Sequence, residues 1–463
     1  MRGKVGFLIT HSDNYYGIQY KLHEKALKEL KEFSNKLDCD VISYGPIKNA
    51  EGALAAKKYF ELEKIDYLII FIADFSTGDI MMCFDDVSYR IGLWFPKEPY
   101  KEGDIQLNAA VSANMFASIA QRKFDNAVYC DWYYGNVNDK LVKDRLEINL
   151  RVAKAKKNIE NATIGILGDV APTFYNLENQ NINELFPNME FIHFDMDYII
   201  KNVEDVTEKE IEEAKNLILN SCNIVQTQEK SIINSAKVYV VLKKYLLDNK
   251  IDCLAGTCWP DFQDAFKIVP CVIYSLLGSE LNIPTACEGD IGGAISLLMA
   301  KELSGKVPTL MDLTSIDEET GSLLLWHCGI GSKDLQPNEG VKIINHPMLD
   351  RKNPNRELMG LSYDYHFKVG DVTVLRYSNN HKLLSFECEV QKSSGGYSGT
   401  RGYLNHFTYL GETYTVEDIV DTIFRNGIEH HLIICPGRIG EMLNKLAEEM
   451  DIPVINIEKY KRC

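Results

Sequence analysis

Long apolar runs are missing from this sequence of 463 residues. No stretch of about 18 or more apolar residues occurs, so we expect no membrane-spanning helix. The N-terminal segment MRGKVGFLIT has an apolar run of only about five residues, which is too short for the core of a signal peptide and is typical of a first β-strand. We therefore expect the protein to be cytoplasmic.

Positive charge is also in short supply. The chain has 50 Lys and Arg against 66 Asp and Glu, a formal net charge of −16. Proteins that bind nucleic acid normally present a basic face, and anionic membranes attract basic surfaces. We expect neither nucleic acid nor a membrane as a partner. The 12 cysteines include no CxxC pair and no zinc-finger spacing, so most are expected to be buried thiols in a reducing compartment.

Several motifs of nucleotide-dependent enzymes and hydrolases are absent. The sequence has no GxGxxG after an expected strand, no Walker lysine loop, no GxSxG elbow and no HExxH. These absences disfavour dinucleotide-dependent, ATP-dependent and serine-hydrolase chemistry.

The patterns that are present predict an α/β protein. The length suits about two to four domains. The first two thirds alternate strand and helix patterns, such as the apolar strand 67–72, which predicts parallel sheets in α/β layers. Thr207 and Glu210 have capping-box spacing and predict a helix start. From about residue 323, short strands with Gly and Asn turns predict an antiparallel sheet or barrel.

Candidate catalytic carboxylates lie near the ends of expected strands. Glu288 and Asp290 stand in TACEGDIGG, between a strand and a glycine-led helix. Either could act in chemistry, and either could simply cap the helix. Asp312, in VPTLMDLTS, is by itself more typical of a turn or cap residue.

Histidines and an aromatic segment complete the set of candidates. His430 and His431 precede the buried pattern LIIC, and adjacent residues of an extended chain point to opposite sides, so we expect only one of them to reach a given site. His327 in LLWHCG is a candidate ligand or a buried structural histidine. In TCWPDFQ, Trp259 offers a face for stacking on a sugar ring and Gln263 an amide for its hydroxyls, although ordinary core packing is an equal alternative.

Together these segments resemble the L-fucose isomerase/L-arabinose isomerase family, and most closely its shorter, fucose isomerase-like members. The resemblance is strongest over about residues 250–330 and 425–460, and it depends on the order and spacing of several motifs. These motifs are TCWPDFQ (257–263), PTACEGD (284–290), LMDLTS (310–315), LLWHCG (324–329), HHLIICPGRIG (430–440) and DIPVINI (451–457).

The resemblance implies a divalent metal, typically Mn²⁺, bound by a glutamate, a second carboxylate and a histidine. The matching residues are Glu288, Asp312 and His431. Aspartate in second place is the pattern of the fucose branch, and His327 is the nearest match to a fourth ligand of the arabinose branch. Glu288 and Asp312 are also the expected acid/base pair.

The resemblance also implies the fold and the assembly. We expect two Rossmann-like three-layer α/β domains, residues 1–160 and 161–302, followed by a C-terminal domain, residues 303–463, that contains an antiparallel β-barrel. Members assemble as trimers or hexamers with active sites at subunit interfaces. His11 and Tyr16, in HSDNYYG, are therefore candidate substrate contacts in a neighbouring subunit.

Such residues suit the interconversion of an aldose and a ketose. A metal ion that binds the sugar's O1 and O2 polarises the carbonyl, and one carboxylate carries a proton between C2 and C1. The expected substrate is an L-fucose- or D-arabinose-like sugar or a modified hexose such as a sulfonated one. For a sulfonated sugar, Arg401 and Arg438 are candidate cations, although either could be a surface or structural arginine.

Two other classes of protein remain open at this point. One is a non-catalytic sugar-binding or regulatory protein on the same scaffold, because ligands alone do not establish turnover. The other is a metal-independent α/β enzyme, such as a lyase, that uses the same carboxylates.

Overall fold

The computed structural model describes residues 2–459 apart from 179–181, 183–185, 350, 356 and 394. The chain divides into two compact units, Met1–Asn158 and Ile159–Cys463. None of the helices in the described ranges is long and apolar enough to cross a membrane.

The first unit is built around a parallel sheet of five strands in the order β2-β1-β3-β4-β5. The strands are β1 (Gly3–Thr10), β2 (Cys39–Ile47), β3 (Tyr67–Ile72), β4 (Arg90–Phe95) and β5 (Asp131–Tyr134), and the helices are α1 (Leu22–Lys36), α2 (Ala50–Glu63), α3 (Asp79–Met82), α4 (Ala109–Arg122) and α5 (Lys140–Glu160).

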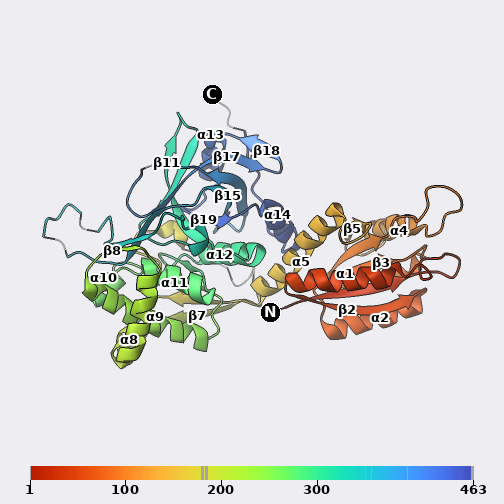
Figure 1. Ribbon diagram of the computed structural model, residues 1–463, viewed down its shortest axis with the longest axis horizontal. Helices are drawn as coiled ribbons and strands as arrows, with labels where there is room; N and C mark the ends of the chain where they lie inside the picture. The colour runs from red at the N-terminus through yellow and green to blue at the C-terminus, as the bar shows by residue number, and fades with distance from the viewer. Residues whose placement is uncertain are drawn as a thin grey trace. The chain divides into compact units, whose positions relative to one another are not determined.

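Strand β3 is buried along its whole length, which shows that the sheet of this unit is covered on both faces. Leu68, Ile70 and Ile72 pack into a core with side chains of α2, α3 and α4. Ile69 and Phe71 pack into a second core with side chains of α1 and α5. Successive residues of a strand point to opposite faces, so a continuous apolar run fits a sheet covered on both faces. The first unit is therefore a three-layer α/β sandwich (Figure 1).

The second unit begins with a four-stranded parallel sheet in the order β10-β9-β6-β7. Its strands are β6 (Thr163–Leu167), β7 (Glu190–Phe194), β9 (Cys253–Gly256) and β10 (Thr285–Ala286), and the helices in this part of the chain are α7 (Met196–Asn202), α8 (Glu208–Asn220), α9 (Glu229–Asp248), α10 (Asp261–Phe266), α11 (Cys271–Leu281) and α12 (Ile291–Ser304).

The rest of the second unit is a large mixed sheet of ten strands in the order β12-β11-β19-β15-β16-β17-β14-β13-β8, with β18 paired to β17. The strands are β8 (Ile224–Gln226), β11 (Thr309–Asp317), β12 (Ser322–His327), β13 (Lys342–Ile344), β14 (Ser362–His366), β15 (Gly370–Tyr377), β16 (Leu383–Val390), β17 (Thr400–Tyr409), β18 (Glu412–Tyr414) and β19 (His431–Pro436), and the helices are α13 (Val416–Arg425) and α14 (Gly440–Glu449). Strand β12 pairs with β17 as well as with β11.

Helix α12 connects the two sheets of the second unit. It contacts β9 and β10 of the parallel sheet and β15 and β19 of the mixed sheet, and Figure 1 shows it between them. Its apolar body is buried on all sides, which fits the uninterrupted run AISLLMA. The start of α12 is therefore held where the ends of strands from both sheets meet.

Candidate metal and active site

Glu288 lies in a tight turn between β10 and α12. Its backbone has φ +62°, and the next residue, Gly289, has φ +72°. A non-glycine residue adopts this left-handed conformation at a cost, and such strain gathers at functional sites. Glycine is required next, because a Cβ at Gly289 would stand 2.8 Å from the carbonyl oxygen of Asp169. The turn directs the Glu288 side chain, which is 15% exposed, toward the histidines of β19.

Asp312 and His431 face each other across two strands. Asp312 lies inside β11 and His431 begins β19, and the two residues are directly opposite in the antiparallel register. Opposite residues of a pair of strands share one face, which explains why Asp312 Oδ1 lies 3.6 Å from His431 Nε2. Glu288 Oε2 lies 3.5 Å from the same nitrogen. The structure thus brings these three residues together, and Asp312 is a strand residue rather than a turn or cap.

Asp290 fixes the orientation of the His431 ring. Its carboxylate caps α12 by accepting from the Gly293 backbone N–H at 2.8 Å. It also accepts from His431 Nδ1 at 2.9 Å. With Nδ1 as the donor, Nε2 of the neutral ring keeps its lone pair for another partner. Asp290 is therefore both a helix cap and the residue that sets the histidine tautomer.

The arrangement of these donors fits a divalent cation. His431 Nε2 is buried and has no hydrogen-bond partner among the described residues. Two carboxylate oxygens face it at 3.5 and 3.6 Å, so positive charge between these atoms, either a proton on the ring or a metal ion, is favoured. A histidine held by a carboxylate behind it and facing further carboxylates is the pattern that metal ligands adopt. Oxygen and imidazole donors without thiolate suit Mn²⁺ or Mg²⁺.

The charge of Asp290 is balanced by a fully buried arginine. Arg376 of β15 donates Nη1 and Nη2 to the two oxygens of Asp290 at 2.5 and 3.0 Å, and Nε to Glu429 at 3.0 Å. Burial alone would raise the pKa of Asp290, but the charge of Arg376 and the His431 hydrogen bond outweigh it and hold that pKa well below its usual range. Asp290 therefore stays ionised behind the histidine.

The pKa values of Asp312 and His431, which face each other, are also shifted. Burial raises the pKa of Asp312 to about 6, and the charges of His431 and His430 oppose this. Burial alone would lower the pKa of His431, but its hydrogen bond to Asp290 and the nearby carboxylates raise it. A carboxylic acid with a raised pKa is suited to exchanging protons near neutral pH.

His430 also reaches the site, so the expectation that only one of the two histidines would do so is wrong. His430 Nε2 lies 3.3 Å from Glu288 Oε2, and the Glu288, His430 and His431 ligand atoms all lie within 4.8 Å of one another. The reason is local: β19 begins only at His431, so the alternation of an extended strand does not apply to the residue before it.

An aromatic wall stands beside His430. The Phe174 ring stacks on it with centroids 5.1 Å apart, and the Trp259 ring meets Phe174 edge-on at 6.4 Å. Trp259 is 36% exposed, so its ring is available to a ligand. Gln263 is buried on α10, and its Oε1 has no hydrogen-bond partner in the described part of the chain.

His327 lies at the end of β12, and its ring centroid is 6.4 Å from that of His431. Its Nδ1 accepts from the Ile330 backbone N–H at 3.4 Å. Burial lowers its pKa well below the usual range, so the ring is neutral. The proton of that ring then resides on Nε2, which suits a hydrogen-bond donor to substrate better than a metal ligand.

His11 and Tyr16 belong to the first unit, in the loop that follows β1. Asp74 organises this loop by accepting from the backbone N–H groups of Ser12 and Gly17 at 2.6 and 2.9 Å. Tyr16 is 52% exposed. The contact of these two residues with a substrate in another subunit stays a prediction.

The chain is similar to curated proteins named sulfoquinovose isomerase. It is 25% identical over 396 residues to that of Alkalicoccus urumqiensis, covering 83% of this chain and 84% of the relative. It is also 25% identical over 400 residues to that of Priestia aryabhattai, covering 84% and 85%. These relatives support a sugar isomerase. The sequence-based prediction of an aldose–ketose isomerase agrees with these names, whereas the fucose isomerase-like branch stays a prediction.

Other comparisons add little. No protein-family model matches the chain. A solved structure of an ABC transporter periplasmic solute-binding protein from Actinobacillus succinogenes 130z, with bound D-allose, is 10% identical and covers 65% of this chain and 92% of that one. Its TM-score of 0.17 is too low to support a shared fold.

Sequence reasoning missed the residues that support His431. Arg376 and Glu429 lie in no motif, and the sequence around Asp290 indicates only a catalytic carboxylate or a helix cap. The signal that was available is the tripeptide Glu429-His430-His431, in which a carboxylate and two histidines precede a buried strand. Its partner Arg376 lies 53 residues earlier than Glu429, and no local pattern connects the two.

Proposed function

We propose that this protein is an aldose–ketose isomerase that acts on a sulfonated sugar and uses one divalent metal ion. The proposal depends on the meeting of Glu288 and Asp312 at His431 Nε2, which has no hydrogen-bond partner among the described residues. The names of the relatives supply the sulfonated sugar as the substrate class.

The reaction needs a group that carries a proton between neighbouring carbons of the sugar. Glu288, Asp312 and His431 would hold the metal ion, with His430 next to Glu288 as an alternative ligand. When bound, the ion polarises the sugar's carbonyl and hydroxyl oxygens. Glu288 and Asp312 are the acid/base pair: one carboxylate takes the proton from C2 and returns it to C1, and the other manages the hydroxyl protons. The raised pKa of Asp312 suits the second role.

We assign the sulfonated end of the sugar to a hollow beside Asp312, which Glu288, Asp312 and His431 themselves do not line. Its volume is about 290 Å³, and it is lined by Thr314, two residues after Asp312, and by Trp326, the cross-strand partner of Asp312. Tyr397 and Arg351 line it as well. Aromatic rings offer faces to the apolar side of a sugar. A guanidinium is the natural partner for a sulfonate, whose oxygens resemble those of phosphate.

Of the three arginines that could bind the sulfonate, Arg351 fits best. Among the described residues no carboxylate pairs with Arg351, and its guanidinium donates a hydrogen bond to Met348 Sδ at 3.5 Å. Arg401 is already paired with Asp364 at 2.7 Å. Arg438 lies two residues beyond the far end of β19 from His431, and the strand itself spans roughly 17 Å. Arg438 is also paired with Asp371 and Glu387.

Replacing Arg351 with glutamine is therefore expected to raise KM for a sulfonated aldose about tenfold, because a charge-assisted contact is lost. The variant should leave kcat/KM for the unsulfonated aldose unchanged. Arg438→Gln is the matched control and should alter neither value. Equal effects of Arg351→Gln on both sugars would assign the residue to folding or general packing instead.

Removing the metal should abolish turnover. After dialysis against EDTA, ketose formation from a panel of aldoses that includes sulfonated hexoses should fall to background and return with Mn²⁺. Binding of the sugar without isomerisation in the Mn²⁺-loaded protein would favour a sugar-binding protein. Activity that survives chelation would favour a metal-independent enzyme such as a lyase.

Finer features of the expected protein stand as proposals. Pairing of β12 with both β11 and β17 supports closure of β12, β11, β19, β15, β16 and β17 into an antiparallel barrel. The same proposal includes a division of the second unit between residues 302 and 303, Mn²⁺ as the ion and a cytoplasmic location. It also includes an assembly of three or six chains, in which His11 and Tyr16 act across a subunit boundary.

A further inference from the structure

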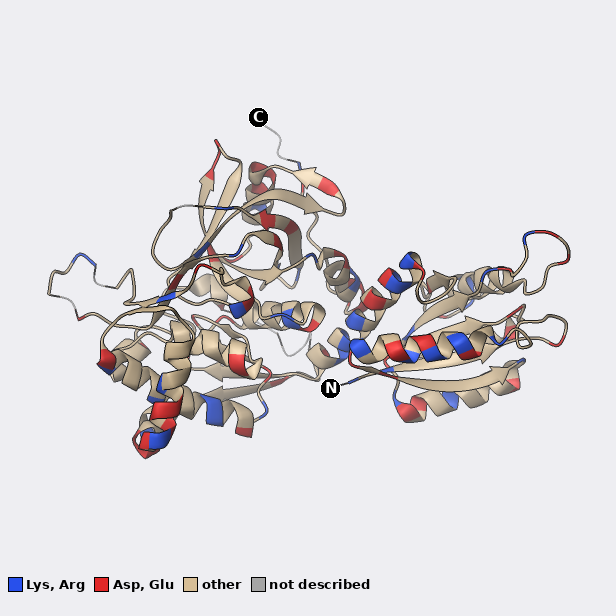
Figure 2. Ribbon diagram, in the orientation of Figure 1, with Lys and Arg blue, Asp and Glu red and all other residues tan. Residues whose placement is uncertain are grey.

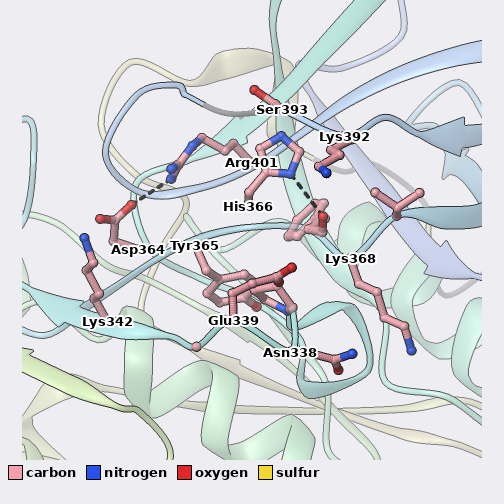
Figure 3. Close-up of a pocket in the computed structure, with 14 residues that line it drawn as sticks. Asn338, Glu339, Lys342, Asp364, Tyr365, His366, Lys368, Lys392, Ser393 and Arg401 are labelled. Carbon is pink, nitrogen blue, oxygen red and sulfur yellow. Dashed lines mark hydrogen bonds and ion pairs between the residues drawn. The ribbon is translucent and has the colours of Figure 1, made fainter.

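A second cavity lies between β13, β14, β17 and the segment after β16 (Figure 3). Its volume is about 630 Å³, more than twice that of the hollow beside Asp312. Its cationic side chains are Lys342, Lys368, Lys392 and Arg401, and its acidic ones are Glu339 and Asp364. The wall thus carries an excess of two positive charges in a chain whose net charge is −16.

The three lysines are free to bind an anion. In the described part of the chain no carboxylate lies within ion-pair distance of Lys342, Lys368 or Lys392, whereas Arg401 is paired with Asp364. Elsewhere acidic and basic residues are interspersed along outer helices such as α1 and α8 (Figure 2). Unpaired cations around one hollow attract anions more strongly than cations spread over a surface.

His366, which lines the cavity, carries an unsatisfied hydrogen-bond acceptor that is itself buried. His366 Nδ1 donates to the carbonyl oxygen of Phe367 at 3.0 Å, and burial lowers the pKa of the ring. The neutral ring then leaves a lone pair on Nε2, which is buried and has no partner among the described residues. A buried acceptor of this kind needs a donor such as a hydroxyl group or a water molecule.

Lys342 of this cavity lies beyond the reach of a sugar bound at Asp312, whereas Arg401 on its near wall is two strand spacings, roughly 10 Å, from Asp312. Register pairs place Asp312, Trp326, Arg401 and His366 in one row across β11, β12, β17 and β14, and Lys342 lies one strand further on β13. Four strand spacings separate Asp312 from Lys342, roughly 19 Å along the sheet. A six-carbon sugar with a terminal sulfonate spans roughly 9 Å at most, from bonds of about 1.5 Å.

We propose that this cavity is a second ligand site, which binds a small hydroxylated anion carrying a phosphate or sulfonate group. The three lysines neutralise the anionic group, and Asn338 and Ser393 on the wall offer polar side chains to its hydroxyls. The site does not depend on the isomerase reaction, because none of its residues belongs to the Glu288, Asp312 and His431 set.

Calorimetric titration of the full chain with hexose 6-phosphate, a sulfonated hexose and inorganic phosphate tests the site. The Glu288→Gln variant, without added metal, serves as the parent protein, so that turnover does not interfere. At least one hexose anion is expected to bind more tightly than inorganic phosphate, and its affinity should fall as salt screens the lysines.

Replacing Lys342, Lys368 and Lys392 together with glutamine should weaken that binding about tenfold or more. The matched control replaces Lys140, Lys209 and Lys243, which are exposed elsewhere, with glutamine and changes the net charge equally. The control should bind as the parent does. Asp364→Asn should bind several-fold more tightly, because it releases Arg401.

Outcomes that would overturn the proposal are distinct from those that concern the isomerase. Equal affinity in the triple-lysine variant and the control, or no binding of any of the three anions, removes the second site and leaves the catalytic proposal untouched. If a sulfonated hexose binds once to the parent and the triple-lysine variant binds it equally, the sugar occupies only the hollow beside Asp312.

Discussion

Glu288→Gln is expected to lower ketose formation by about 10²- to 10⁴-fold while the protein stays folded. Glutamine keeps the size and shape of the side chain and its φ-strained turn, but it carries no charge and cannot accept the C2 proton. It also removes one of the oxygens that face His431 Nε2. Turnover, thermal unfolding and solvent-deuterium exchange at C2 of the sugar are the measurements.

Exchange at C2 separates a catalytic role from a structural one. A variant that folds and still binds sugar but exchanges no deuterium has lost the proton carrier. Glu280→Gln, at the exposed end of α11, is the control and should match the unmodified protein in all three measurements. Near-normal turnover of Glu288→Gln would remove Glu288 from the reaction.

Arg376→Met is expected to destabilise the protein by about 3–5 kcal/mol. The side chains of Arg376 and Asp290 are 0% exposed and that of Glu429 is 4% exposed, so the change leaves two buried carboxylates without their cation. The stability of Arg376→Lys should fall between those of the unmodified protein and Arg376→Met. Lysine keeps the positive charge but loses the forked guanidinium that engages both carboxylates. Calorimetric unfolding midpoints measure the order of the three proteins.

The pH dependence of this effect has a definite sign. In the unmodified protein the pKa of Asp290 is depressed, so its ion pair stabilises the fold above the unfolded pKa near 3.8 and is lost as the pH falls through the folded value. Arg376→Met lacks this pair, so its deficit in stability should be largest at neutral pH and shrink under acid conditions. A deficit that is independent of pH would indicate lost packing rather than uncompensated charge.

Much of the fold follows from local pattern. The apolar run 67–72 predicted a buried strand and is β3. Thr207 and Glu210 predicted a capped helix, and both bonds of the capping box are present at the start of α8. These elements are decided by residues within a few positions of one another. The pairing of β12 with β17 joins residues far apart in the chain, such as Leu323 and Leu404, which no local pattern reveals.

The candidate site also has residues that local motifs predict and residues that only long-range packing brings together. Glu288, Asp312 and His431 stand in motifs whose order resembles a known family, and the structure places them around one nitrogen atom. Taken by itself, Asp312 is more typical of a turn. Its partner across the sheet, His431, lies far along the chain, so the local sequence does not reveal that Asp312 belongs to a strand. Arg376 is 86 residues from Asp290, and their pairing depends on how β15 packs against α12.

The opposition of Asp312 and His431 across β11 and β19 has a thermodynamic consequence. The two residues face one another only in the native register, since a shift by one residue would turn His431 to the other face. An ion held there binds the folded second unit and not the unfolded chain. Each tenfold increase of the free ion concentration above its Kd therefore adds about 1.4 kcal/mol to the free energy of unfolding of that unit. The first unit contains none of the three proposed ligands and would gain nothing directly. The concentration of the metal ion would therefore set the stability of the second unit in addition to its chemistry.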